Sequence, residues 1–136
     1  MNFNLFLGLS KNKNITLKNI TLMTEDQLQQ QIYTWYNNNF CLKNHIPRHV
    51  IFSVPNGGSR NIIEAKKLKA TGLLSGVSDL IILQQNKTLF IELKIEKGVQ
   101  SDKQKEFEER VKSLGFNYYI VRSLEEFKTI IEIEKA

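Results

Sequence analysis

Two short apolar runs separated by four polar residues form the most hydrophobic stretch of the chain. The runs lie within residues 76–83 and 88–94, and the polar residues between them resemble a turn. Two runs rich in Leu and Ile with a polar break of this length predict a β-hairpin. A hairpin symmetric about the junction of Gln85 and Asn86 pairs Ile82 with Leu89, Leu80 with Ile91, and Asp79 with Glu92.

Within the two apolar runs, charged residues stand only where the first run begins and where the second ends. Directly opposed side chains of an antiparallel pair lie on one face, with Cβ atoms about 4.5–5.5 Å apart, so Asp79 and Glu92 would repel each other unless a cation lies between them. Because side chains alternate between the two faces of a strand, Lys94 projects to the same face as Glu92. The pattern favours a metal site with an adjacent ammonium group. The alternative is that these charges mark strand ends that emerge into water, because a Glu-x-Lys triplet is common.

The lack of alternating charge through both runs predicts strands that are buried on both faces. Before them, Thr24 and Gln27 have the spacing of a capping box and predict a helix that ends near residues 37–39. Its apolar stripe consists of Leu28, Ile32, Trp35 and Tyr36. Glu25 lies in the first turn, where an acid is either part of a site or a partner of the helix dipole.

A strand at residues 50–54 and a turn at residues 55–58 precede a second helix. Ser59 is expected to cap this helix, which reaches about Ala70 and is terminated by Gly72. The helix is basic, and a run of basic residues is either a solvated face or a phosphate-binding surface. Its basic residues are Arg60, Lys66, Lys67 and Lys69, and its expected apolar contacts are Ile63 and Leu68.

The last third of the chain predicts a helix, a strand and a helix. Ser101 and Gln104 form a second capping box, and Gly115 ends the helix that they open. The strand covers residues 117–122, and Ser123 caps the last helix. The side chains expected to face the core are Phe107, Val111 and Leu114 in the first helix and Leu124, Phe127, Ile130 and Ile131 in the second. The order of elements predicts an α/β fold with a mixed sheet flanked by helices.

Composition narrows the class of protein. The chain has 136 residues, 41% of them hydrophobic and 24% charged, which suits one soluble globular domain. The net charge of +5 favours a polyanionic partner, although Lys-rich and Asn-rich composition also arises in an AT-biased genome. No apolar run approaches the roughly 18 residues that span a bilayer, and the run from Phe3 to Leu9 is short and lacks the basic start of a signal peptide.

Several kinds of chemistry are excluded. A single cysteine, Cys41, rules out an intramolecular disulfide and suits a reducing cytosol. His45 and His49 are four residues apart, but Pro47 prevents them from sharing a helical face, which argues against zinc. The sequence has no phosphate-loop or dinucleotide-binding pattern, and no nucleophile-elbow motif.

Five short sequence motifs, which occur in the same order as in the family, resemble a VRR-NUC domain of the PD-(D/E)XK nuclease superfamily. They are PNGG at 55–58, KLKATGLLSGVSDLIIL at 67–83, LFIELK at 89–94, SDKQKEF at 101–107 and YIVRSLEEF at 119–127. The resemblance covers residues 24–127 and implies a restriction-endonuclease-like core in a domain of residues 24–136, preceded by an arm of residues 1–23. Ser78 departs from the family, which more often has proline there.

The resemblance also implies a site. Asp79, Glu92 and the backbone carbonyl of Leu93 would hold Mg²⁺ or Mn²⁺, which prefer oxygen ligands. Glu25 would complete the metal shell, and Lys94 would orient the attacking water or stabilise charge on the phosphate.

Further residues are expected at the edge of that site. Gln104 matches the glutamine of the family's Ser-x-x-Gln element, in competition with its capping role. Asn56 and Arg60 would contact the substrate from a Gly-rich loop. The lysines of the basic helix, Lys66, Lys67 and Lys69, would bind DNA phosphates.

The expected function is that of a metal-dependent DNA endonuclease in a bacterial or phage-infected cytosol. The small domain favours selection of DNA structure, and the family implies branched substrates such as four-way junctions, in replication, repair or recombination. A symmetric junction would require two active sites and therefore a homodimer. The alternatives are a basic module that binds nucleic acid without cutting it and a basic module that binds a partner protein.

Overall fold

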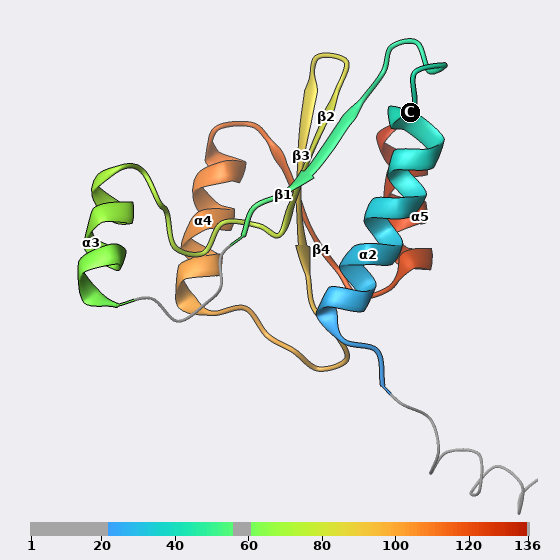
Figure 1. Ribbon diagram of the computed structural model, residues 1–136. Coiled ribbons are helices and arrows are strands. Elements are labelled where there is room, and N and C mark those ends of the chain that lie inside the picture. Colours follow the sequence, from blue (N-terminus) through green and yellow to red (C-terminus); the bar gives the residue numbers. More distant parts are fainter. Residues whose placement is uncertain (1–21, 56–60, 136) are drawn as a thin grey trace, which may run out of the picture.

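The computed structural model describes residues 22–55 and 61–135. The predicted order of helices and strands is confirmed (Figure 1). The expected arm of residues 1–23 falls almost wholly outside the described residues, as do most of the turn at 55–58 and the proposed cap Ser59. The elements are α2 (Glu25–Tyr36), the π-helical turn η1 (Asn37–Cys41), β1 (Val50–Ser53), α3 (Ile62–Ala70), β2 (Leu80–Gln84), β3 (Lys87–Leu93), α4 (Asp102–Ser113), β4 (Asn117–Val121) and α5 (Leu124–Glu134).

Four described strands form one mixed sheet in the order β1-β2-β3-β4. β2 is antiparallel to both of its neighbours, β1 and β3, whereas β3 runs parallel to β4. The predicted hairpin register is confirmed through β2 and β3, where Leu80 pairs with Ile91 and Ile82 with Leu89. Asn86 turns the chain with a φ of 58°, a left-handed conformation that asparagine tolerates better than most residues.

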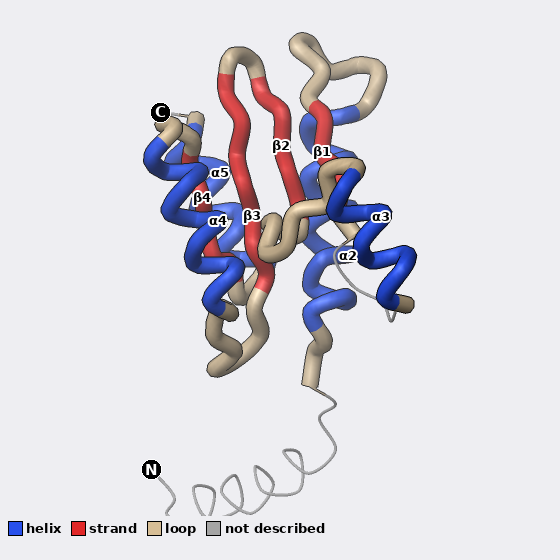
Figure 2. The backbone as a smooth tube through the Cα atoms, turned by 90° about the vertical axis from the view of Figure 1, so that its left-hand side faces the viewer, coloured by secondary structure: helices blue, strands red, loops and turns tan. Residues whose placement is uncertain are grey.

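The main core lies between the sheet and the two helices α2 and α5, which lie side by side on one face of the sheet (Figures 1 and 2). The capping box at Thr24 and Gln27 is present, and it opens α2 at the predicted residue. The side chains of this core come from every strand and from both helices. They include Leu28, Ile32, Tyr36, Ile51, Leu80, Ile82, Leu89, Ile91, Leu93, Val121, Phe127 and Ile131.

The first α-helix ends at Tyr36 with Asn37 as its C-cap, as predicted, but a π-helical turn, η1, continues the helical path to Cys41. In this extra turn, the ring of Phe40 stacks on the ring of Tyr36, with 4.6 Å between the ring centroids, and Cys41 is buried in the main core. The side-chain amide of Asn39 donates a 2.7 Å hydrogen bond to the carbonyl of Trp35, which satisfies a backbone acceptor at the widened turn. The asparagine tract therefore ends the α-helix, and the packing of the apolar residues beyond it accounts for the π-helical turn that follows.

The opposite face of the sheet is only partly covered. Helix α4 packs there on β3 and β4, where the Phe107 ring lies 5.8 Å from Phe90. Over β1 and β2 the same face stays open, with Val50, Phe52 and Leu83 each 40–48% exposed. The prediction of burial on both faces therefore holds for most of β3 and is wrong for β2.

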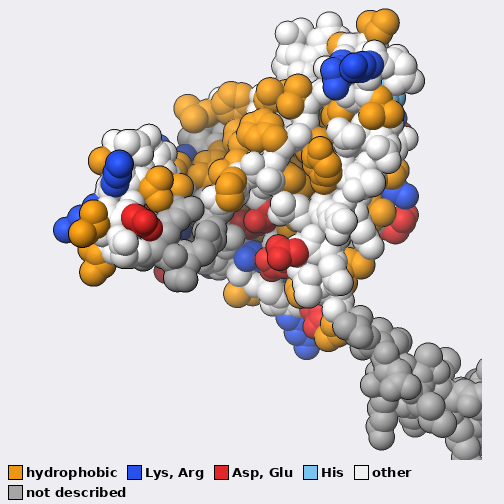
Figure 3. Space-filling view, viewed as in Figure 1, with side chains coloured by type: hydrophobic (Ala, Val, Ile, Leu, Met, Phe, Trp, Pro, Cys, Tyr) orange, Lys and Arg blue, Asp and Glu red, His pale blue; other side chains and the backbone are white. Residues whose placement is uncertain are grey.

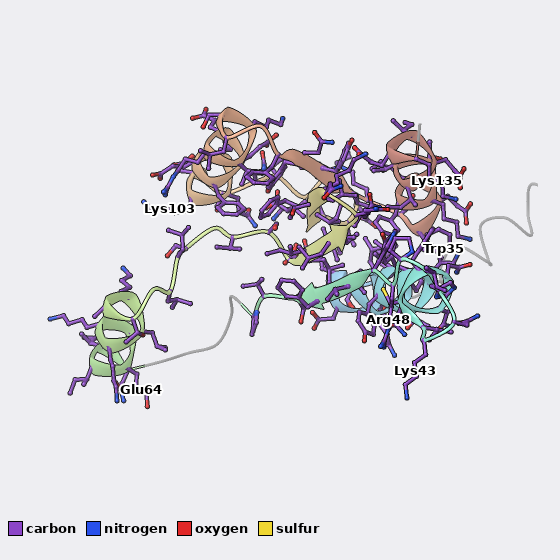
Figure 4. The ribbon with its side chains drawn as sticks, turned by 90° about the horizontal axis from the view of Figure 1, so that it is seen from above. Trp35, Lys43, Arg48, Glu64, Lys103 and Lys135 are labelled. Atoms are coloured by element: carbon purple, nitrogen blue, oxygen red, sulfur yellow. The ribbon has the colours of Figure 1, made fainter. Side chains whose placement is uncertain are left out.

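Helix α3 stands away from the body of the domain (Figures 1 and 4). The helix begins at Ile62, and its cap is Asn61, which accepts a hydrogen bond from the Glu64 N–H, and not the expected Ser59. Gly72, with a φ of 109°, follows its end as predicted. Because no sheet face lies beneath the helix, Ile63 is 80% exposed, which contradicts its expected apolar contact.

Leu114, expected in the core, is 74% exposed just beyond the end of α4. Within the described ranges, no helix combines the length and the apolar character needed to cross a bilayer.

Candidate active site

Asp79 lies immediately before β2 and is fixed by backbone contacts. Its Oδ2 accepts a 2.7 Å hydrogen bond from the N–H of Leu93, and its carbonyl accepts one from the N–H of Val54 at 3.0 Å. The assigned register begins at Leu80, and its continuation by one residue sets Asp79 opposite Glu92. Burial raises the pKa of the Asp79 carboxyl, although the Leu93 hydrogen bond and the charge of Lys94 oppose that rise.

Glu92, a predicted ligand, has the most unusual environment of the site residues. Its side chain is fully buried in β3, and neither carboxylate oxygen has a hydrogen-bond partner. Burial raises the pKa of this carboxyl, and the nearby charge of Asp79 raises it further. A buried, unpartnered carboxylate is costly, and such groups in native proteins commonly coordinate metal ions or take part in catalysis.

Two polar side chains approach Glu92 from neighbouring elements. The Tyr118 hydroxyl and the Gln100 amide both favour the charged form of the carboxylate and lower its pKa, against the larger effect of burial. Neither group meets the distance and angle of a complete hydrogen bond with the carboxylate oxygens. The Glu92 oxygens therefore keep their capacity to bind a ligand.

Lys94 follows β3 on the face of Glu92. Its charge lowers the pKa of both Asp79 and Glu92, which brings the three predicted residues into one electrostatic cluster. Gly98 lies beside the Lys94 stem, where a Cβ would be 3.5 Å from Cδ. The half-buried ammonium forms no direct ion pair among the described residues, so it is available to a phosphate.

The first helix brings a second acid, Asp26, close enough to act on the site. Glu25 is exposed in the first turn of α2, and its role in a metal shell stays a prediction. Its neighbour Asp26 acts on Asp79, whose pKa it raises through like charge. Sequence reasoning missed Asp26, although its spacing from Gln30 and Tyr33 (i, i+4, i+7) defines one helix face.

That face lines a cleft of about 350 Å³ that reaches the start of β2. Its lining residues are Asp26, Gln29, Gln30, Tyr33, Ser53 and Leu80. The cleft therefore connects the first turns of α2 to the strand that carries the site.

Gln104 performs its capping role. Its side-chain oxygen accepts a 2.8 Å hydrogen bond from the Ser101 N–H, and the Ser101 Oγ accepts a 3.2 Å hydrogen bond from the Gln104 N–H. The start of α4 lies very close to the loop that leads to Asp79. At Gly76 in that loop, an added Cβ would lie only 2.3 Å from the Lys103 carbonyl oxygen. Contact of Gln104 with a substrate stays a prediction.

The predicted DNA contacts are distributed unevenly. Asn56 and Arg60 lie outside the described residues. Lys66 and Lys67 are exposed on α3, while Lys69 lines a cleft of about 290 Å³ between the end of α3 and α4. Lys103 and Arg110 of α4, which sequence reasoning did not select, line the same cleft, and Figure 4 shows Lys103 on α4. The other lining residues are Leu73, Leu74, Ser75, Glu106 and Phe107.

The oxygen donors suit a hard divalent ion such as Mg²⁺ or Mn²⁺ better than a softer metal such as zinc or copper. Among residues 22–55 and 61–135, no group of three or more His, Cys, Asp or Glu side chains is arranged to hold a metal. Mg²⁺ keeps several waters and is usually bound through one or two carboxylates together with substrate phosphates. Asp79 and the unpartnered Glu92 supply two carboxylates, and the Leu93 backbone supplies a nearby carbonyl.

Comparison with known proteins agrees with this geometry. The family model of the VRR-NUC domain matches residues 20–125. A solved structure described as a VRR_NUC domain protein shares the fold, with a TM-score of 0.64, 24% sequence identity, and coverage of 83% of this chain and 88% of that chain. No match was found among curated proteins. The chain belongs to the VRR-NUC domain family, a family of nuclease type.

Proposed function

We propose that this protein is a metal-dependent DNA endonuclease. Its active site, formed by Asp79, Glu92 and Lys94, would hydrolyse phosphodiester bonds of DNA. The observation that carries the proposal is the Glu92 carboxylate, which is fully buried with both oxygens unpartnered. A structural carboxylate in this position would be expected to have partners. The cluster with Asp79 and Lys94 supports a divalent cation as the missing partner.

Mg²⁺ or Mn²⁺ is the cation that this donor set supports. Within an extended strand, the N–H and C=O of one residue project to the same side. Since the Leu93 N–H points at Asp79, the Leu93 carbonyl faces the same region and would be a third oxygen ligand. When bound, such an ion polarises the phosphodiester and lowers the pKa of a water molecule.

The chain's own residues would perform the remaining tasks. Asp79 and Glu92 orient the bound phosphate by fixing its counter-ion. The Lys94 ammonium donates hydrogen bonds to the phosphate oxygens as charge develops, or holds the attacking water. Glu25, through water, would complete the shell from α2, and Asp26 is placed to share that role because its charge already acts on Asp79.

DNA would approach across α3 and α4. The protruding helix α3 carries Lys66, Lys67 and Lys69, and the cleft beside it adds Lys103 and Arg110. The loop along this cleft leads through Gly76 directly to Asp79. Cations on two elements separated by a cleft favour contact with more than one DNA segment, which supports branched DNA such as a four-way junction as the substrate.

A homodimer would supply two sites for a symmetric junction. The open face over β1 and β2 supports this state, since Val50, Phe52 and Leu83 leave apolar area exposed there (Figure 3). Exposed contiguous apolar surface commonly marks an interaction site. We expect the wild type to sediment as a dimer and Phe52→Glu to sediment as a monomer. A monomeric wild type that still cuts both strands symmetrically would contradict the dimer.

A panel of labelled substrates tests the proposed function. Linear duplex, flap and four-way-junction DNA of matched sequence are incubated with Mg²⁺ or with Mn²⁺, and the products are resolved by size. We expect metal-dependent cleavage, with faster cutting of the branched molecules. Binding without cleavage on every substrate would leave a nucleic-acid-binding module instead.

A further inference from the structure

A buried tyrosine lies beside Glu92 on the same face of the sheet. Tyr118 in β4 pairs with Phe90 in β3, and Glu92 follows two residues later, so the side chains of Tyr118 and Glu92 project to the same face. Tyr118 is only 6% exposed, and its ring lies 6.2 Å from that of Phe107 on the helix above. The Tyr118 hydroxyl is therefore enclosed beneath α4 and needs a protein partner.

Gln100 sets the direction of that hydroxyl. The Gln100 Nε2 donates a 3.0 Å hydrogen bond to Oε1 of Glu108 and lies 3.5 Å from the Tyr118 oxygen, which accepts its other proton. Glu108 is paired with Lys112, so it stays ionised and can only accept. The NH₂ end of Gln100 must therefore face Tyr118, and the Tyr118 proton must point away from Gln100.

Glu92 is the acceptor in that other direction. Burial raises the pKa of the Tyr118 hydroxyl, and the charge of Glu92 raises it further. Both Glu92 oxygens still lack a partner with complete hydrogen-bond geometry. Each of the two side chains shifts the pKa of the other, and both project to the same face of neighbouring strands, so the hydroxyl and the carboxylate are neighbours.

We propose that Tyr118, oriented by Gln100 and Glu108, is a positioning residue that donates a hydrogen bond to one Glu92 oxygen and directs the other toward the bound cation. This rests on the proposed function, because it requires Glu92 to hold a divalent ion. Groups that orient a metal ligand from behind typically contribute 10- to 100-fold to metal affinity. We expect a loss of that size when the Tyr118 hydroxyl is removed.

The test is a titration of the full chain with Mn²⁺ in the absence of DNA. The concentration of free Mn²⁺ is measured at each point from its electron paramagnetic resonance signal. Tyr118→Phe should weaken Mn²⁺ binding by about 10-fold or more. Tyr119→Phe is the matched control, since it removes the hydroxyl of the neighbouring tyrosine, which donates to Glu134. The control should bind Mn²⁺ as the wild type does.

A second variant keeps the test decisive if Tyr118→Phe does not fold. Gln100→Leu leaves the Tyr118 ring in place but removes the donor that orients its hydroxyl, so a smaller loss of Mn²⁺ affinity is expected. Wild-type affinity in both Tyr118→Phe and Gln100→Leu would overturn the positioning role and leave the proposed nuclease intact. A wild type that binds no Mn²⁺ would overturn both.

Discussion

The carboxylate of Asp79 accepts a 2.7 Å hydrogen bond from the backbone N–H of Leu93, which joins the start of β2 to the end of β3. This bond fixes the Asp79 side chain against the strand that carries Glu92. It also fixes the direction of the Leu93 peptide group. One short contact thus sets the relative positions of two acidic side chains and one carbonyl.

Asp79→Asn should leave the metal-free protein at least as stable as the wild type at neutral pH. The Asn Oδ1 can still accept the Leu93 hydrogen bond, and the substitution removes a charge that burial disfavours. Stabilisation by saturating Mg²⁺ should be lost, because a neutral amide is a weak ligand. Thermal unfolding with and without Mg²⁺ measures both effects, and marked destabilisation of the metal-free variant would instead favour a structural role for Asp79.

Glu92 should make the metal-free protein less stable as the pH rises. Burial raises its folded-state pKa above the ordinary 4.5, so the folded state holds the proton more tightly than the unfolded state does. The resulting stabilisation is complete below about pH 4.5 and is lost as the pH rises through the folded-state pKa. We expect the free energy of unfolding in urea, measured from about pH 4.5 upward, to depend less on pH in Glu92→Gln than in the wild type. An equal dependence on pH in the two proteins would contradict a raised pKa at Glu92.

Glu134 should have the opposite effect on stability. Burial would raise its pKa, but the Tyr119 hydroxyl and the Lys87 ammonium, 3.0 Å away, outweigh burial and lower it. The stabilisation is present above the ordinary value of 4.5 and is lost as the pH falls through the folded-state pKa. Glu134→Gln should cost about 2 kcal/mol of unfolding free energy at pH 7 and less at acidic pH, measured by urea unfolding. A cost that does not change with pH would contradict this role.

Most of the framework could be predicted from local patterns. The hairpin register follows from the polar break between two apolar runs, and the capping boxes at Thr24 and Ser101 open their helices at the predicted residues. These features depend on residues close together in the sequence. Side-chain packing over longer distances decided the rest, as at η1, where Phe40 and Cys41 extend the first helix into the core.

The site was predictable only where the hairpin alone defines it. The grouping of Asp79, Glu92 and Lys94 follows from strand register and period. The choice between Glu25 and Asp26 depends on how α2 is rotated against the sheet, which no local pattern specifies. Likewise, Lys103 lies in a cleft with Lys69 because Gly76 brings its loop onto the start of α4.

Gly76→Ala should damage both the fold and the site. A Cβ there would meet the Lys103 carbonyl oxygen at 2.3 Å, on a residue whose φ is +84°. Clash and backbone strain together should cost about 3 kcal/mol of unfolding free energy. Gly72→Ala is the control, because its φ is +109° but no atom lies within 4 Å, so only about 1 kcal/mol of strain is expected. Equal losses in chemical denaturation would contradict the close approach at Gly76.

The central claim is tested most directly by the rate at which DNA is cut with Mg²⁺ under single-turnover conditions. The wild type, Glu92→Gln, Lys94→Met and the exposed-lysine control Lys105→Met are compared on the preferred branched substrate. We expect no cutting by Glu92→Gln, a loss of about 10²- to 10³-fold in Lys94→Met, and the wild-type rate in Lys105→Met. Wild-type cleavage in the presence of a chelator, or an undiminished rate in Glu92→Gln, would contradict hydrolysis at this site.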